Sequence, residues 1–141
     1  MAVEQNAALT WLQEAETTEK HRLFVYGTLM KGKRNHAAFM KNAEYLGEAS
    51  IYGFALYDFG RCPGIIHSDE PRLVHGELYE VDDNDYDAIC VHEGNGSVYR
   101  CEAVPVILDH SGEWMPAKTF VFLGSVFEND RVPGDLQVWG T

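Results

Sequence analysis

Basic residues are scarce in this sequence of 141 residues: 11 Lys and Arg stand against 22 Asp and Glu, which gives a formal net charge of −11. A nucleic-acid-binding surface needs clustered positive charge to neutralise phosphates, so the composition disfavours nucleic acid as a partner. Cysteine is also scarce, with three residues and no C-x-x-C spacing: Cys62, Cys90 and Cys101. Neither a disulfide framework nor a zinc ribbon is indicated.

Long apolar runs are missing as well. No segment reaches the about 20 apolar residues that cross a bilayer. The first residues, MAVEQNAALTWLQEAETTEK, lack the basic start and the continuous apolar stretch of a secretory signal. The content of 45% hydrophobic and 23% charged residues is typical of a folded domain. We therefore expect a cytoplasmic protein with no membrane association.

The chain length fits one domain with a core of its own. Residues 1–20 are acidic and carry only a short helical stripe of apolar side chains. They are expected to be an N-terminal appendage, either helical or disordered. The domain itself is expected over residues 21–141.

The patterning of the domain favours strands over helices. Strands are expected over residues 23–25, 44–58, 73–81, 99–108 and 115–123. Gly47 and Gly53 are expected to bend the second of these segments, as in a small barrel. Because the helices do not alternate regularly with the strands, the expected fold class is α+β, a small mixed β-barrel with flanking short helices.

Two helices are expected between the strands. The first covers about residues 35–42, with Asn35 as its N-cap and with Ala38, Phe39 and Met40 buried. The second begins after the capping pair Asp82-Asp83 and runs to about Glu93, where Gly94 favours a left-handed turn that ends the helix.

Glu93 is the most informative acidic residue. It falls on the same helical stripe as Tyr86, Ile89 and Cys90, where burial and the negative end of the helix dipole would both raise its pKa above about 4.3. Such a glutamate can take and return a proton near neutral pH. After a sharp turn, Tyr99 can point its phenol back towards the carboxylate. The alternative is a helix that ends one turn earlier and leaves Glu93 in water.

The first strand ends in Tyr26, Gly27, Thr28 and Leu29. This loop exposes successive backbone N–H groups with little side-chain bulk at Gly27, which suits a carboxylate or a developing oxyanion. Taken alone, the string is also compatible with an ordinary turn between a strand and a loop.

Four motifs taken together resemble the gamma-glutamylcyclotransferase-like family, of the gamma-glutamylamine cyclotransferase type. In chain order they are Tyr26-Gly27-Thr28-Leu29, Gly32-x-x-Asn35-His36, Val74-His75-Gly76-Glu77-Leu78-Tyr79, and Glu93-Gly94 followed by Tyr99-x-Cys101. The resemblance covers roughly residues 22–125. Cys90 and His92 depart from the aspartate and the apolar residue that members commonly carry beside the glutamate.

The resemblance implies a small mixed β-barrel with a cleft at one end. It also implies that the loop from Tyr26 to Leu29 holds a gamma-glutamyl group through its backbone, that Glu93 is the acid/base, and that Tyr99 lies beside it. The implied reaction releases 5-oxoproline and a free amine from a small gamma-glutamyl substrate, without a metal or an organic cofactor. The alternative function is a non-catalytic module that binds a small acidic metabolite or a partner segment in the same pocket.

Other polar residues allow two interpretations each. Cys90, His92 and Glu93 invite a metal site, but residues two apart on a helix point to different sides, which disfavours it. His75 and Glu77 share a strand face and either contact substrate or form a hydrogen-bonded pair inside the barrel. The basic cluster formed by Lys31, Lys33 and Arg34 either steers an anionic substrate or is a solvated loop.

Overall fold

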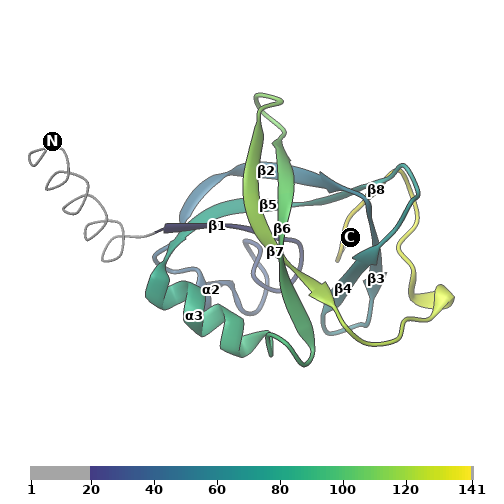
Figure 1. Ribbon diagram of the computed structural model, residues 1–141, viewed down its shortest axis with the longest axis horizontal. Coiled ribbons are helices and arrows are strands. Elements are labelled where there is room, and N and C mark those ends of the chain that lie inside the picture. The colour runs from purple at the N-terminus through teal and green to yellow at the C-terminus, as the bar shows by residue number, and fades with distance from the viewer. Residues whose placement is uncertain (1–19, 141) are drawn as a thin grey trace, which may run out of the picture.

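The structure is a computed structural model that describes residues 20–140. A closed barrel of five strands forms its centre (Figure 1). The strands are β1 (Lys20–Val25), β2 (Glu44–Tyr52), β5 (Leu73–Asp82), β6 (Tyr99–Leu108) and β7 (Trp114–Phe122). They neighbour one another in the order β1-β7-β6-β2-β5, and β5 pairs with β1 to close the barrel. The β1–β7 pair is parallel and the other barrel pairs are antiparallel, so the sheet is mixed as expected.

Shorter elements cover the barrel. The hairpin of β3 (Phe54–Asp58) and β4 (Pro63–His67) lies at the end of the molecule that also holds β8 (Leu136–Gln137), which adds in parallel to β5 (Figure 1). The helices α2 (His36–Phe39) and α3 (Asp83–His92) lie together on one side of the barrel, and a short 3₁₀ turn, η1 (Glu128–Asp130), precedes β8. No helix within residues 20–140 is long and apolar enough to cross a membrane.

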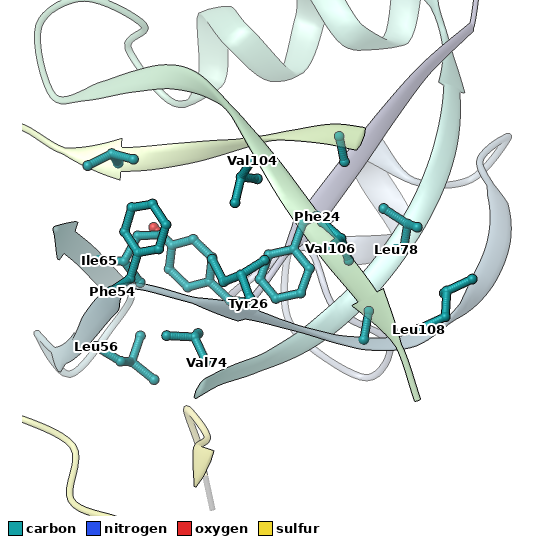
Figure 2. Close-up of a cluster of buried hydrophobic side chains, with 14 residues drawn as sticks. Phe24, Tyr26, Phe54, Leu56, Ile65, Val74, Leu78, Val104, Val106 and Leu108 are labelled. Atoms are coloured by element: carbon teal, nitrogen blue, oxygen red, sulfur yellow. The ribbon is translucent and has the colours of Figure 1, made fainter. Parts of the chain in front are cut away.

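β1 is buried on both of its faces. Phe24, followed by Tyr26 just after the strand, points into the cluster that fills the barrel (Figure 2). Leu23 and Val25 point outward into a second cluster between the barrel and the helices, which includes Ile89 of α3. Burial on both faces explains why the second half of this strand, Leu23-Phe24-Val25, is continuously apolar instead of alternating.

The α+β barrel expected from the sequence is confirmed, and several local predictions are confirmed with it. β2 and β3 are separate strands that break at Gly53, and the register of β2 against β5 shifts between Tyr45 and Gly47. Asp82 caps α3, because its Oδ1 accepts a hydrogen bond from the N–H of Asp85 at 2.8 Å. The appendage expected over residues 1–20 lies outside the described residues apart from Lys20, which begins β1.

The prediction for the first helix is correct in its N-cap residue, Asn35, and in the burial of Met40, but its length, its capping hydrogen bond and the burial of Ala38 and Phe39 differ from the prediction. α2 covers only His36–Phe39, and the Asn35 side chain makes no capping hydrogen bond because its amide contacts two other side chains. Ala38 is exposed and Phe39 is only partly buried, whereas Met40 is 2% exposed. A helix of one turn has no extended stripe to bury, so the periodicity of residues 35–42 misled the prediction.

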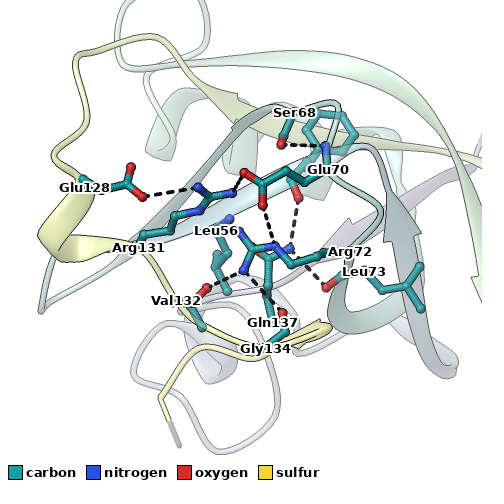
Figure 3. A network of polar contacts seen from close by, with 11 residues as sticks. Leu56, Ser68, Glu70, Arg72, Leu73, Glu128, Arg131, Val132, Gly134 and Gln137 are labelled. Carbon is teal, nitrogen blue, oxygen red and sulfur yellow. Dashed lines mark hydrogen bonds and ion pairs between the residues drawn. The ribbon is translucent and has the colours of Figure 1, made fainter.

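The chain after residue 124 returns to the barrel through a polar network that the sequence did not indicate (Figure 3). Arg131 pairs with Glu70, and Arg72 donates to the carbonyl oxygens of Val132 (3.1 Å) and Gly134 (3.3 Å). At its centre, the fully buried Gln137 donates to the carbonyl oxygens of Phe54 (3.0 Å) and Leu73 (3.2 Å) and accepts from the N–H of Leu56 (2.8 Å). One side chain thus satisfies backbone groups of both β3 and β5.

We expect Gln137→Leu to lower the free energy of unfolding by about 3 kcal/mol, because each buried backbone group that loses its partner costs about 1–3 kcal/mol. Urea unfolding of the wild type and the variant measures this difference. Leu136→Ala, which alters the half-exposed neighbour in the same strand, is the matched control and should cost less. A loss below about 0.5 kcal/mol for Gln137→Leu would contradict the assigned role.

Candidate functional site

A narrow pocket of about 40 Å³ opens where β1 ends, beside the C-terminal end of α3 and the start of β4. The structure brings every site residue predicted from the sequence to this one pocket. The lining residues are Phe24, Val25, Tyr26, Gly27, Thr28, Leu29, Cys62, Pro63, Glu93, Tyr99 and Phe120. Most of the walls are apolar, so the few polar groups decide what the pocket can bind.

The loop after β1 is held mainly through its carbonyl groups. The carbonyl oxygen of Gly27 accepts from the N–H of Met30 at 3.1 Å, and that of Thr28 accepts from the N–H of Asn35 at 3.0 Å. His36 Nδ1 lies 2.8 Å from the carbonyl oxygen of Leu29 and donates to it. Within residues 20–140, the N–H groups of Gly27, Thr28 and Leu29 donate to no backbone carbonyl or side chain. These donors are therefore available to a ligand, as the sequence suggested.

Gly27 lies against the hairpin β3–β4 too closely for any side chain. A Cβ atom at this position would lie 2.6 Å from Cδ and Cγ of Pro63. Glycine is thus required here by the close approach of the loop to the proline ring. This contact closes one wall of the pocket.

A buried carboxylate holds the far end of the loop. Glu77, 9% exposed, accepts from the N–H of Lys31 at 2.9 Å and from the hydroxyl of Tyr79 at 3.0 Å. The two interpretations of the pair on β5 both need correction. His75 lies 3.8 Å from Glu48 instead of pairing with Glu77, and neither His75 nor Glu77 lines the pocket.

Glu93 follows the last residue of α3 and is placed by the end of the helix. Its N–H still donates to the carbonyl oxygen of Ile89 at 2.9 Å, and Gly94 then turns the chain with a φ of +63°. Burial raises the pKa of the Glu93 carboxyl to about 7. No side chain or N–H group within residues 20–140 donates a hydrogen bond to this carboxylate. The group is thus poised to gain or lose a proton near neutral pH.

Two phenols face the same pocket and donate to backbone oxygens. The hydroxyl of Tyr99 donates to the carbonyl oxygen of Pro63 at 2.6 Å, and that of Tyr26 donates to the carbonyl oxygen of Phe120. Burial, together with the nearby charge of Glu93, raises the pKa of both tyrosines well above the usual range. Tyr99 therefore lies beside Glu93 as expected, but its proton is directed to Pro63 and not to the carboxylate.

Residues next to Glu93 in sequence point elsewhere. Cys90 does not line the pocket, and burial raises the pKa of its thiol. The ring of His92 packs on Phe39 with ring centroids 4.3 Å apart. Within residues 20–140, no group of His, Cys, Asp or Glu side chains is arranged to hold a metal ion. In the basic cluster, Lys31 Nζ lies 3.3 Å from the centroid of the Tyr45 ring, away from the pocket lining.

Sequence reasoning missed the wall formed by Cys62 and Pro63. It named Asn35 and Glu77 but not the supporting roles that the structure gives them. The string Arg61-Cys-Pro-Gly64 is typical of a turn, and nothing local links it to a loop more than 30 residues earlier. The signal that could have indicated the role of Glu77 is its polarity at a strand position flanked by apolar neighbours.

A family model described as gamma-glutamyl cyclotransferase, AIG2-like, matches residues 23–139. The chain belongs to this family. The resemblance inferred from the motifs is thereby confirmed. A putative gamma-glutamylcyclotransferase of Methanocaldococcus jannaschii is 34% identical over 92 residues, which are 64% of this chain and 76% of that protein.

Two further proteins are similar to this member of the cyclotransferase family. The gamma-L-glutamyl-butirosin B gamma-glutamyl cyclotransferase of Niallia circulans is 45% identical over 60 residues, 42% of this chain and 36% of that protein. The crystal structure of an AIG2-like protein from Mus musculus superposes with a TM-score of 0.69 at 23% identity, covering 79% of this chain and 82% of that one. At this identity the likeness shows the fold alone.

The raised pKa of Glu93 predicts a pH-dependent contribution to stability. Between about pH 4.3, the pKa expected in the unfolded chain, and about 7, the folded protein keeps a proton that the unfolded chain has released. The contribution of Glu93 to the free energy of unfolding therefore falls as the pH rises through this window. Glu93→Gln should match the wild type near about pH 4 and be more stable near about pH 8, by on the order of 2 kcal/mol after a discount for partial exposure.

Urea unfolding at a series of pH values measures this difference. Glu113→Gln, which changes an exposed glutamate in the β6–β7 turn, is the matched control and should follow the wild type at every pH. The same pH dependence in wild type and Glu93→Gln would contradict the assigned shift.

Proposed function

We propose that the protein is a gamma-glutamyl cyclotransferase that cleaves small gamma-glutamyl amides to 5-oxoproline and a free amine, with Glu93 as the acid/base. The observation that carries this proposal is the partly buried Glu93 carboxyl, whose pKa is raised to about 7, in the same pocket as the unused N–H groups of Gly27, Thr28 and Leu29. The pocket thus offers one proton acceptor and several donors for negatively charged oxygen.

The substrate carries its own nucleophile. The α-amine of a gamma-glutamyl group attacks the side-chain amide carbonyl, so a C–N bond forms and closes a five-membered ring. The former amide C–N bond then breaks and releases the amine. Because the attack is intramolecular, the protein needs mainly to hold a folded conformer and to move protons.

The proton transfers require a group that works in both directions. Bound substrate enters with an ammonium group, which must lose a proton before it can attack. The ionised Glu93 takes this proton and gives it to the nitrogen of the departing amine. The attacking nitrogen loses a second proton as the ring forms, Glu93 passes it on in the same way, and the amine leaves as an ammonium ion, so the carboxylate is restored at the end of the cycle. A pKa near 7 suits both transfers at neutral pH, because neither protonation state is strongly disfavoured.

The loop after β1 supplies hydrogen-bond donors for the negatively charged oxygen atoms of the substrate. Its free N–H groups can hold the α-carboxylate of the substrate or the oxyanion that develops on the attacked carbonyl. No Lys or Arg side chain is among the residues that line the pocket. Recognition of the anionic end therefore depends on these N–H groups and on the Thr28 hydroxyl.

The name of the Niallia circulans relative supports the substrate class, since it is a gamma-glutamyl cyclotransferase named for gamma-L-glutamyl-butirosin B. The pocket itself is small, about 40 Å³. We infer that the leaving amine lies outside the pocket, so residues beyond its lining select the amine.

We expect the wild type to release 5-oxoproline from at least one member of a panel of gamma-glutamyl amines, gamma-glutamyl amino acids, gamma-glutamyl-lysine and glutathione. Glu93→Gln keeps the shape of the side chain but cannot accept the proton, so its rate should fall at least about 100-fold. Quantification of 5-oxoproline by mass spectrometry measures both. Glu113→Gln is the matched control and should retain the wild-type rate.

Release at equal rates by wild type and Glu93→Gln would contradict the role of Glu93. No release from any substrate, combined with saturable binding of 5-oxoproline that survives Glu93→Gln, would favour the non-catalytic binding module. A module that only binds anions gains nothing from a carboxylate in its pocket, which is why the catalytic function is preferred.

A further inference from the structure

The side-chain amide of Asn35 lies between the binding loop and the end of α3. Its Nδ2 is 3.1 Å from Thr28 Oγ1 and 3.2 Å from His92 Nε2. Thr28 lines the pocket, and His92 directly precedes Glu93. Asn35 directly precedes α2 and His92 ends α3, and these two helices lie on the same side of the barrel (Figure 1). One amide therefore touches both halves of the site without lining the pocket.

The donor count at Asn35 fixes the direction of these hydrogen bonds. An amide nitrogen carries two hydrogen atoms, and the two neighbouring atoms can take one each. His92 Nε2 then acts as an acceptor, which requires the neutral imidazole with its proton on Nδ1. Thr28 Oγ1 also acts as an acceptor, so the hydrogen atom of the Thr28 hydroxyl is not donated to Asn35.

The Thr28 hydroxyl hydrogen has no other acceptor within residues 20–140. Thr28 is 8% exposed, and a buried hydroxyl without an acceptor is costly. A negatively charged oxygen bound next to the free N–H groups of the loop would supply the missing acceptor. Hydrogen bonds to charged groups are the stronger ones, so the orientation of this hydroxyl matters for ligand affinity.

We propose that Asn35 is a positioning residue that turns the Thr28 hydroxyl towards the anionic end of the substrate and ties the binding loop to the end of α3 that carries Glu93. The inference rests on the proposed function for the identity of the substrate. Asn35 acts through Thr28 and His92 and does not contact the reacting atoms.

Asn35→Asp is the informative variant because aspartate has the same shape but only accepts hydrogen bonds. The Thr28 hydroxyl would then donate to the new carboxylate and be lost to the ligand. We expect KM for the best gamma-glutamyl substrate and Kd for 5-oxoproline to rise about tenfold or more, with a smaller change in kcat. Asn129→Asp adds the same charge at an exposed position of η1 and should change neither constant.

A double-mutant cycle separates positioning from a merely structural role. Thr28→Val removes the hydroxyl and should weaken binding to a similar extent. If Asn35 acts through that hydroxyl, Asn35→Asp in the Thr28→Val background should add less than about a twofold further loss. Thermal unfolding of all variants checks that each is folded.

Independent, multiplicative effects of the two substitutions would overturn the inference. Unchanged constants in Asn35→Asp would also overturn it, because they would show an amide in the opposite orientation that accepts from Thr28. Measurement of Kd for 5-oxoproline does not require turnover. If the protein binds 5-oxoproline with a non-additive double-mutant cycle but releases no 5-oxoproline from any substrate, the inference on Asn35 stands and the proposed function is contradicted. A wild type that neither binds 5-oxoproline nor turns over substrate contradicts both.

Discussion

The site depends on the contact between the backbone of Gly27 and the ring of Pro63. A Cβ atom at residue 27 would lie 2.6 Å from that ring, so the loop after β1 and the start of β4 approach each other too closely for any side chain at this position. The carbonyl group of the same proline accepts the hydroxyl of Tyr99 at 2.6 Å. One residue of the hairpin thus fixes both the binding loop and the tyrosine beside Glu93, and the pocket lies between them.

The chemistry of the site follows from the small number of polar groups in this pocket. Tyr26 and Tyr99 direct their protons to backbone oxygens, so neither stabilises the carboxylate of Glu93. Burial without a hydrogen-bond donor raises the pKa of Glu93 to about 7. The lack of hydrogen-bond donors makes the ionised carboxylate costly, and for the same reason it makes Glu93 a useful proton acceptor. A salt-bridged glutamate would have a low pKa and would hold a proton poorly at neutral pH.

Local patterns in the sequence were sufficient for the fold class and for the central residues of the site. The apolar run Leu23-Phe24-Val25 indicates a strand buried on both faces, and the helical spacing that ends at Glu93 is confirmed by α3 and its glycine turn. These features depend on neighbours within a few residues, which is the range over which periodicity carries information.

The remaining features depend on contacts between distant segments, and sequence patterns do not record those. Asn35 has the residue type of a helix cap, yet its amide contacts the Thr28 hydroxyl and the ring of His92, which is 57 residues away in the sequence. Cys62 and Pro63 reach the pocket through a hairpin separate from the barrel sheet. β8 has two residues, too few for any period, although its buried Gln137 joins β3 to β5.

The dependence of kcat/KM on pH for 5-oxoproline release tests the central claim most directly, because it reports the ionisation of groups in the free enzyme. If Glu93 must be ionised to accept the ammonium proton, kcat/KM should rise with pH through an apparent pKa of about 7. The residual activity of Glu93→Gln should lack this rise. A profile that is flat across the neutral range, or the same rising limb in Glu93→Gln, would contradict the account.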